Sequence, residues 1–108
     1  MPLENTSPDR FSRDVRLHRS HVSLIVAQWT AAQTRNDIPA NVRYEMPALV
    51  SMLDTRRAAH QQEFSNYLTI EAPLSAWIAL GEFCALAGSE GLIAVGREVA
   101  AGISKGGA

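Results

Sequence analysis

The side chains that most often do chemistry are scarce in this sequence, which holds three histidines and one cysteine. His18, His21, His60 and Cys84 offer nitrogen and sulfur ligands, but no two histidines have the i, i+4 spacing that places both on one helix face. Cys84 has no basic sequence neighbour that would lower the pKa of its thiol. We therefore expect no metal, no cofactor and no catalytic residue, and keep a small enzyme only as a third possibility.

The segment "GLIAVGRE", residues 91–98, resembles a phosphate-binding loop in its glycine spacing. That loop continues with lysine and a hydroxyl residue, because the lysine reaches the phosphates and the hydroxyl binds magnesium. Here Arg97 and Glu98 follow Gly96, and a glutamate would repel a phosphate. Small residues placed for close contact between helices are the better interpretation.

Arginines recur at every third position through residues 10, 13, 16 and 19, which suggests a basic strip for phosphates. On a helix, however, each step of three residues rotates by about 300°, so the four side chains spread over half the circumference. Asp9 and Asp14 also neutralise part of the charge. A solvated helix face is favoured, and a nucleic-acid-binding transcriptional regulator using this segment is the alternative function.

A helix-turn-helix interpretation of residues 81–99, "GEFCALAGSEGLIAVGREV", is a second route to DNA binding. The second helix of that motif presents polar side chains to the bases. In this sequence Arg97 and Glu98 are its only large polar side chains before the tail. The pattern argues against a recognition helix, so nucleic acid is not the expected partner.

Helix start and stop signals predict four helices. Pro8, preceded by serine and followed by aspartate, favours a helix start, and nothing interrupts the pattern before about residue 35. Two further prolines, Pro39 and Pro47, indicate a connector, followed by a second helix over about residues 47–68. The third and fourth helices are predicted at about 73–87 and 90–104.

A tight turn is predicted between the last two helices. Gly88 suits the left-handed residue that closes a helix, Ser89 can cap the next helix, and Glu90 favours its first turn. The predicted fold class is therefore all-α, with about four helices, a long first helix and a tight C-terminal helical hairpin. The predicted domain spans residues 8–105, between a flexible arm at 1–7 and a disordered tail at 106–108.

The predicted helix lengths suggest self-association. The first helix would be about 40 Å long, whereas the last two would each be about 22 Å. An uncovered part of the first helix would expose Phe11, Val15 and Leu17, and an exposed apolar stripe usually means a second chain. His18 continues this stripe, either as a pH-sensitive contact or as a satisfied interface or core histidine.

The predicted hairpin is apolar on most of its circumference, so it either meets a second chain or is wrapped by the long first helix. The candidate partner or dimer interface combines residues from the first helix and from the hairpin: Phe11, Val15, His18, Val22, Ile25, Trp29, Trp77, Leu92 and Ile93.

Composition gives no sign of a membrane or a secreted scaffold. The net charge is −1, and the single cysteine allows no intrachain disulfide. Charged residues interrupt every apolar run before it could span a bilayer, and the first residues contain no apolar signal segment. We expect no membrane association and a cytoplasmic location.

The N-terminal arm, the long first helix "SPDRFSRDVRLHRSHVSLIVAQW", the four-helix layout and the apolar terminal hairpin together resemble the small bacterial antiactivators of LuxR-type quorum-sensing regulators, of the QslA type. The resemblance covers the whole chain. It implies a homodimeric, non-catalytic protein that binds the ligand-binding domain of a transcriptional activator such as LasR, and blocks its dimerisation and DNA binding. It supplies no site residues, so the interface candidates come from the apolar pattern alone.

Overall fold

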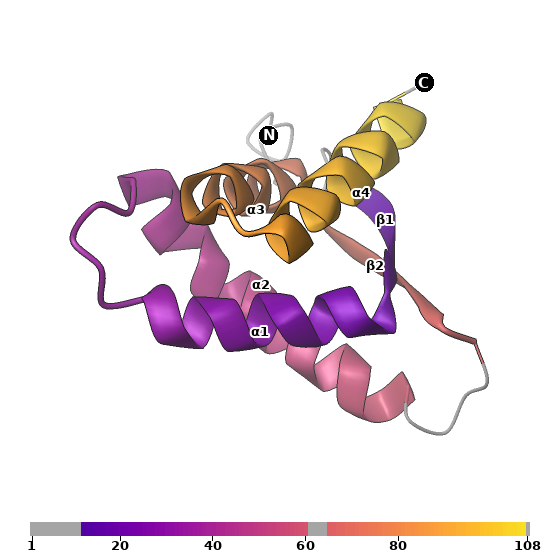
Figure 1. Ribbon diagram of the computed structural model, residues 1–108. Helices are drawn as coiled ribbons and strands as arrows, with labels where there is room; N and C mark the ends of the chain where they lie inside the picture. The colour runs from indigo at the N-terminus through magenta and orange to yellow at the C-terminus, as the bar shows by residue number, and fades with distance from the viewer. Residues whose placement is uncertain (1–11, 61–64, 108) are drawn as a thin grey trace, which may run out of the picture.

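The computed structural model describes residues 12–60 and 65–107. Within them the chain forms β1 (Ser12–His18), α1 (Arg19–Ala32), α2 (Ala40–His60), β2 (Tyr67–Pro73), α3 (Leu74–Ala87) and α4 (Glu90–Gly107). Figure 1 shows α3 and α4 above α1, α2 running diagonally from the upper left to the lower right, and the two strands on the right-hand side. The predicted all-α fold class is wrong, because the two strands pair as an antiparallel sheet and make the fold α+β.

The predicted long first helix is also wrong, because residues 12–18 of it form β1 and the observed helix α1 begins only at Arg19. Val15 and Leu17 are two residues apart with charged neighbours on either side, which is the alternation of a half-buried strand. The pairing register places Val15 opposite Ile70 and Leu17 opposite Leu68, and all four side chains are buried. Val15 and Leu17 of the expected overhanging stripe are therefore not on the surface, and Phe11 lies outside the described residues.

The second helix begins earlier than predicted and ends before β2. Pro47 lies inside α2 although it cannot donate a helical hydrogen bond. Val42, Met46, Leu49 and Leu53 are buried at helical spacing on one face of α2, so tertiary packing outweighs the proline. The segment Tyr67–Pro73, whose first residues were expected to end that helix, instead forms β2.

The turn between α3 and α4 is confirmed. Gly88 has a left-handed φ of 71°, and its N–H donates to the Cys84 carbonyl at 3.1 Å. The Ser89 hydroxyl accepts from the Leu92 N–H at 3.4 Å. Helix α4 continues to Gly107, into the segment expected to be a disordered tail, whereas the predicted arm at 1–7 lies outside the described residues.

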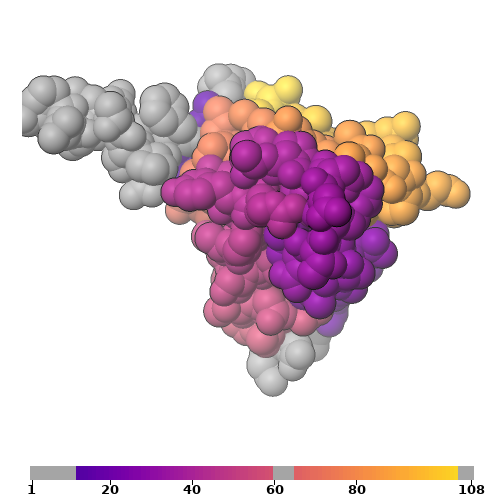
Figure 2. Space-filling model, turned by 90° about the vertical axis from the view of Figure 1, so that its left-hand side faces the viewer, coloured from indigo at the N-terminus to yellow at the C-terminus, as the bar shows by residue number. Residues whose placement is uncertain are grey.

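The core joins the helices to the sheet. Trp29 of α1 meets Phe83 of α3 edge to face, with ring centroids 5.4 Å apart. The buried Trp77 indole donates to the Arg13 carbonyl at 3.0 Å, which ties α3 to β1. Figure 2 shows the face on which α1 and α2 lie side by side, with α3 and α4 above them. None of the helices within the described residues is long and apolar enough to cross a membrane.

We predict that Gly102→Ala destabilises the protein. An added Cβ would lie 3.0 Å from both γ carbons of Val15, which is buried in β1 and has little room to move. Overpacking of this kind costs about 1–3 kcal/mol, and because Val15 has little room to move we expect it to outweigh the gain of about 1 kcal/mol from replacing a helical glycine. Urea unfolding measures the difference.

Gly81→Ala is the matched control, because its Cβ would have no atom within 4 Å. This variant should be as stable as the parent or slightly more stable. Equal unfolding free energies for the two glycine variants would contradict the close contact between α4 and β1.

Candidate protein-docking surface

Most of the interface candidates lie inside the single chain. The core contains Val15, Val22, Ile25, Trp29, Trp77 and Leu92. Each is at most 5% exposed, so in this structure they present no surface to a partner. Phe11 lies outside the described residues, His18 is half-buried, and Ile93 is exposed. The apolar spacing of the six buried candidates therefore reflects packing within one chain, whereas Ile93 is on the surface.

His18 has a local structural role at the junction of β1 and α1. Its Nδ1 accepts from the Ser20 N–H at 3.1 Å and lies 2.7 Å from the Ser20 hydroxyl, so the imidazole caps α1. The His18 ring also meets Tyr67 edge to face, at 5.1 Å between centroids. These contacts account for a histidine at this position without a second chain.

His21 links α1 to α4. Its Nδ1 lies 2.7 Å from the Glu98 Oε1 atom, and both side chains are about a quarter exposed. This contact was not predicted from the sequence, since it joins residues of two distant helices. Among the residues the structure describes, no three histidine, cysteine or acidic side chains gather closely enough to hold a metal ion.

The arginines at positions 13, 16 and 19 do not form a basic strip. Strand alternation places Arg13 on the inner side of β1, where it is half-buried, and Arg16 on the outer side. The Arg16 guanidinium lies over the Tyr67 ring, 4.5 Å from its centroid. Arg19 begins α1. The solvated helix face expected for these arginines is therefore not formed within the described part of the chain, and Arg10 lies outside it.

The surface between α3 and α4 contains an apolar groove of about 310 Å³, which we call the α3–α4 groove. Its walls consist of small residues one helical turn apart, Gly81 and Ala85 on α3 and Gly96 and Ala100 on α4. The groove exists because these positions carry little or no side chain. A Cβ added at Gly96 would lie 3.6 Å from the Cys84 Cβ, which is an ordinary van der Waals distance, so there is room for a small side chain at this position.

Large apolar side chains flank this groove. Ile93 lines it and is 42% exposed, and Ile78, one turn before Gly81, is 49% exposed. Arg97 supplies the charge in the lining. An apolar groove lined by one exposed isoleucine, with a second on α3 one turn from its lining, is a typical contact surface for another protein.

Cys84 lines the groove from beneath as a buried free thiol. Burial raises the pKa of this thiol to about 11, so it is protonated at neutral pH and is not a nucleophile. The groove can bind an apolar group but offers no reactive one.

Sequence reasoning identified Ile93 but missed the groove itself. The available signal was the position of the glycines, all of which follow residue 80, together with small residues at helical spacing. Small residues at helical spacing indicate that another helix or side chain can approach these positions closely. They do not show whether that neighbour belongs to the same chain or to a partner.

Comparisons with protein-family models, with curated proteins and with solved structures find no significant match for this chain.

We predict that the Cys84 thiol makes stability fall at alkaline pH. Its pKa is raised from 9.0 to about 11 in the folded state, so this contribution is fully present below about pH 9 and is lost as the pH rises toward 11. Unfolding measured from pH 8 to pH 11 should show a steeper loss for the parent than for Cys84→Ala. Rapid native-state reaction with a thiol reagent at neutral pH would contradict the prediction.

Proposed function

We propose that this chain is a non-catalytic regulatory protein that binds and sequesters a partner protein through the α3–α4 groove. The observation that supports the proposal is the groove itself, with its small-residue walls and its exposed isoleucines. Side chains of this kind exclude water and provide shape for an apolar insertion, but they offer neither a nucleophile nor a general base.

The geometry of the groove favours a helix as the inserted element. Glycine and alanine at i, i+4 on both walls allow another backbone to approach closely, as ridges fit into grooves between packed helices. Ile93 would serve as the apolar anchor at its edge. Arg97 favours an acidic residue next to the apolar side chain of the partner.

We propose a LuxR-type quorum-sensing activator as the partner, with the chain acting as its antiactivator in the cytoplasm. Capture of the ligand-binding domain would block the activator's dimerisation and DNA binding. This choice is supported by the resemblance to the QslA-type antiactivators. Since β1 replaces residues 12–18 of the predicted long helix, that resemblance rests on chain size and the terminal helix pair.

The proposal includes a homodimer, but not through the first segment of the chain, because Val15 and Val22 are buried within one copy. The α3–α4 groove is the apolar surface that would serve a second copy. Self-association and capture of the activator would then compete for Ile93 and its surroundings. Because the activator would have to displace a second copy, a more stable homodimer would weaken the apparent affinity for the activator.

We predict that Ile93→Glu weakens both self-association and capture of the activator, because it places a charge at the apolar anchor. Loss of a central apolar contact typically costs about 2 kcal/mol or more, which corresponds to roughly 30-fold in affinity. The measurements are sedimentation equilibrium of the full chain and titration against a purified LuxR-type ligand-binding domain.

Tyr44→Glu is the control, because Tyr44 is 82% exposed on α2 and does not line the groove. It should leave both affinities unchanged. Gly81→Ala should weaken capture while preserving stability, because the added methyl group enters open space at the groove.

Three results would count against the proposal. If Ile93→Glu captured the activator like the parent, the groove would be the wrong surface. If the parent failed to bind the activator, the partner would be wrong. Salt-sensitive binding of DNA without protein capture would favour the alternative nucleic-acid-binding function.

A further inference from the structure

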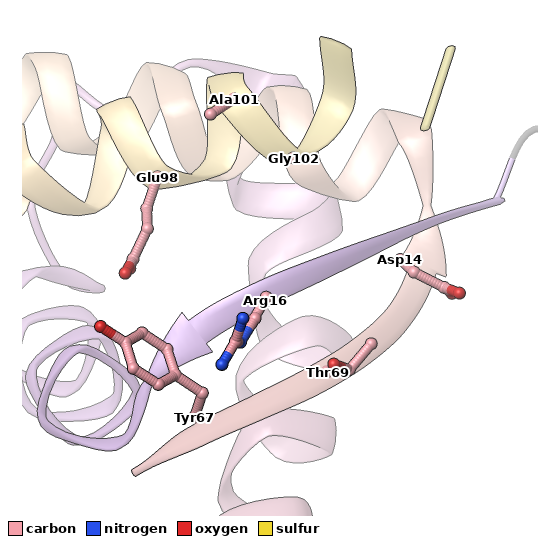
Figure 3. Close-up of a pocket in the computed structure, with 7 residues that line it drawn as sticks. All are labelled: Asp14, Arg16, Tyr67, Thr69, Glu98, Ala101 and Gly102. Carbon is pink, nitrogen blue, oxygen red and sulfur yellow. The ribbon is translucent and has the colours of Figure 1, made fainter. Parts of the chain in front are cut away.

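A second hollow, of about 330 Å³, lies between α4 and the outer face of the β1–β2 sheet (Figure 3). Its polar lining consists of Asp14, Arg16, Tyr67, Thr69 and Glu98. We call it the sheet–α4 hollow. A hollow of this size has room for a small organic ligand.

The strand register brings the groups on the sheet side together. Arg16 lies opposite Thr69 in the pairing, and both point outward from the sheet. The guanidinium of Arg16 stacks 4.5 Å from the centroid of the Tyr67 ring, which restricts its orientation and leaves its N–H edges available. Within residues 12–60 and 65–107, Arg16 has no ion pair and no hydrogen bond from its side chain.

The acidic neighbour of Arg16 on β1 does not neutralise it. Figure 3 shows the Asp14 carboxylate directed away from Arg16, while the Thr69 hydroxyl points toward Arg16. The hollow thus contains the Arg16 guanidinium, stacked on Tyr67 and with N–H groups that no described residue accepts from, next to the Thr69 hydroxyl. A planar carboxylate matches this arrangement by accepting two parallel N–H bonds.

The opposite wall carries an acceptor. The Glu98 carboxylate extends from α4 toward Tyr67 (Figure 3), and its Oε1 is held by the His21 imidazole at 2.7 Å. No described residue engages Oε2. A fixed carboxylate with a free oxygen is suited to an ammonium group, whereas it would repel a phosphate.

We propose that the sheet–α4 hollow binds a small zwitterion of the amino-acid class. The ligand carboxylate would lie on Arg16 and Thr69, and its ammonium group on Glu98. Both charges of such a ligand find an opposite charge within one hollow, which a carboxylate or an amine alone does not achieve.

This site does not depend on the proposed function. It uses the face of α4 that carries Glu98 and Gly102, whereas the α3–α4 groove uses the face that carries Ile93 and Ala100. Ile93→Glu should therefore leave ligand binding unchanged, so failure of one proposal is distinguishable from failure of the other.

The experiment is an NMR titration of the full chain with glycine, 4-aminobutyrate and 6-aminohexanoate, three zwitterions with increasing charge separation. Acetate, butylamine and inorganic phosphate are compared at equal ionic strength. We expect at least one zwitterion to shift the amides of Arg16, Thr69 and Ala101 with an affinity roughly tenfold or more above that of acetate or butylamine, since one charge-assisted hydrogen bond accounts for that factor.

Variants assign the two ends of the ligand. Arg16→Gln should lose roughly tenfold or more in zwitterion affinity, while Arg19→Gln, an exposed arginine outside the lining, should bind like the parent. Glu98→Gln, which keeps a hydrogen-bonding side chain, should bind acetate like the parent and lose the preference for the zwitterion.

The proposal fails if none of the three zwitterions shifts these amides, or if acetate binds as tightly as the best of them. It also fails if phosphate binds more tightly than every zwitterion, or if folded Arg16→Gln binds like the parent.

Discussion

The antiparallel pairing of β1 with β2 is the constraint on which the rest of the structure depends. Each strand leads directly into a helix, β1 into α1 at Arg19 and β2 into α3 at Leu74, so the pairing fixes where both helices begin. On the inner face of the sheet, Val15 and Leu17 are buried beside their partners on β2, Ile70 and Leu68. The outer face, with the opposite side-chain parity, carries Arg16 and Thr69, so one register determines both the core and a polar surface.

The glycines of α4 determine how closely this helix approaches its neighbours. A Cβ at Gly91 would lie 2.6 Å from the Leu24 Cδ2 atom, and one at Gly102 would contact Val15 at 3.0 Å. Glycine weakens a helix interior by about 1 kcal/mol relative to alanine, so these positions exchange intrinsic helix stability for close packing. At Gly96 the missing side chain instead leaves space in the α3–α4 groove. Helix α4 therefore packs closely against its neighbours at some glycines and lines a groove at another.

Sequence reasoning succeeded where the signals were local. Gly88, Ser89 and Glu90 specify a helix end and a helix start by themselves, and the structure confirms that turn. It failed at Val15 and Leu17, because their apolar pattern was assigned to a helix and the strand that pairs with them comes much later in the chain. It failed at Pro47 for a related reason. The proline destabilises a helix locally, but burial of the apolar side chains before and after it on α2 outweighs that free-energy cost. Of the candidate surface it identified Ile93 alone, because exposure depends on tertiary packing.

The two surfaces of α4 should act independently of each other. A ligand at Glu98 can influence docking at Ile93 only if α4 can adopt two positions in the fold and the ligand has a different affinity for each of them. Helix α4 already packs against β1 so closely that a single methyl group at Gly102 would collide with Val15, and His21 fixes Glu98 from the side of α1. Movement toward the sheet is blocked by the first contact, and movement away from it would expose Val15 and Val99, which are buried in this packing. Because both displacements are costly, α4 has one favoured position, and a ligand at one face has no second position of the helix to favour.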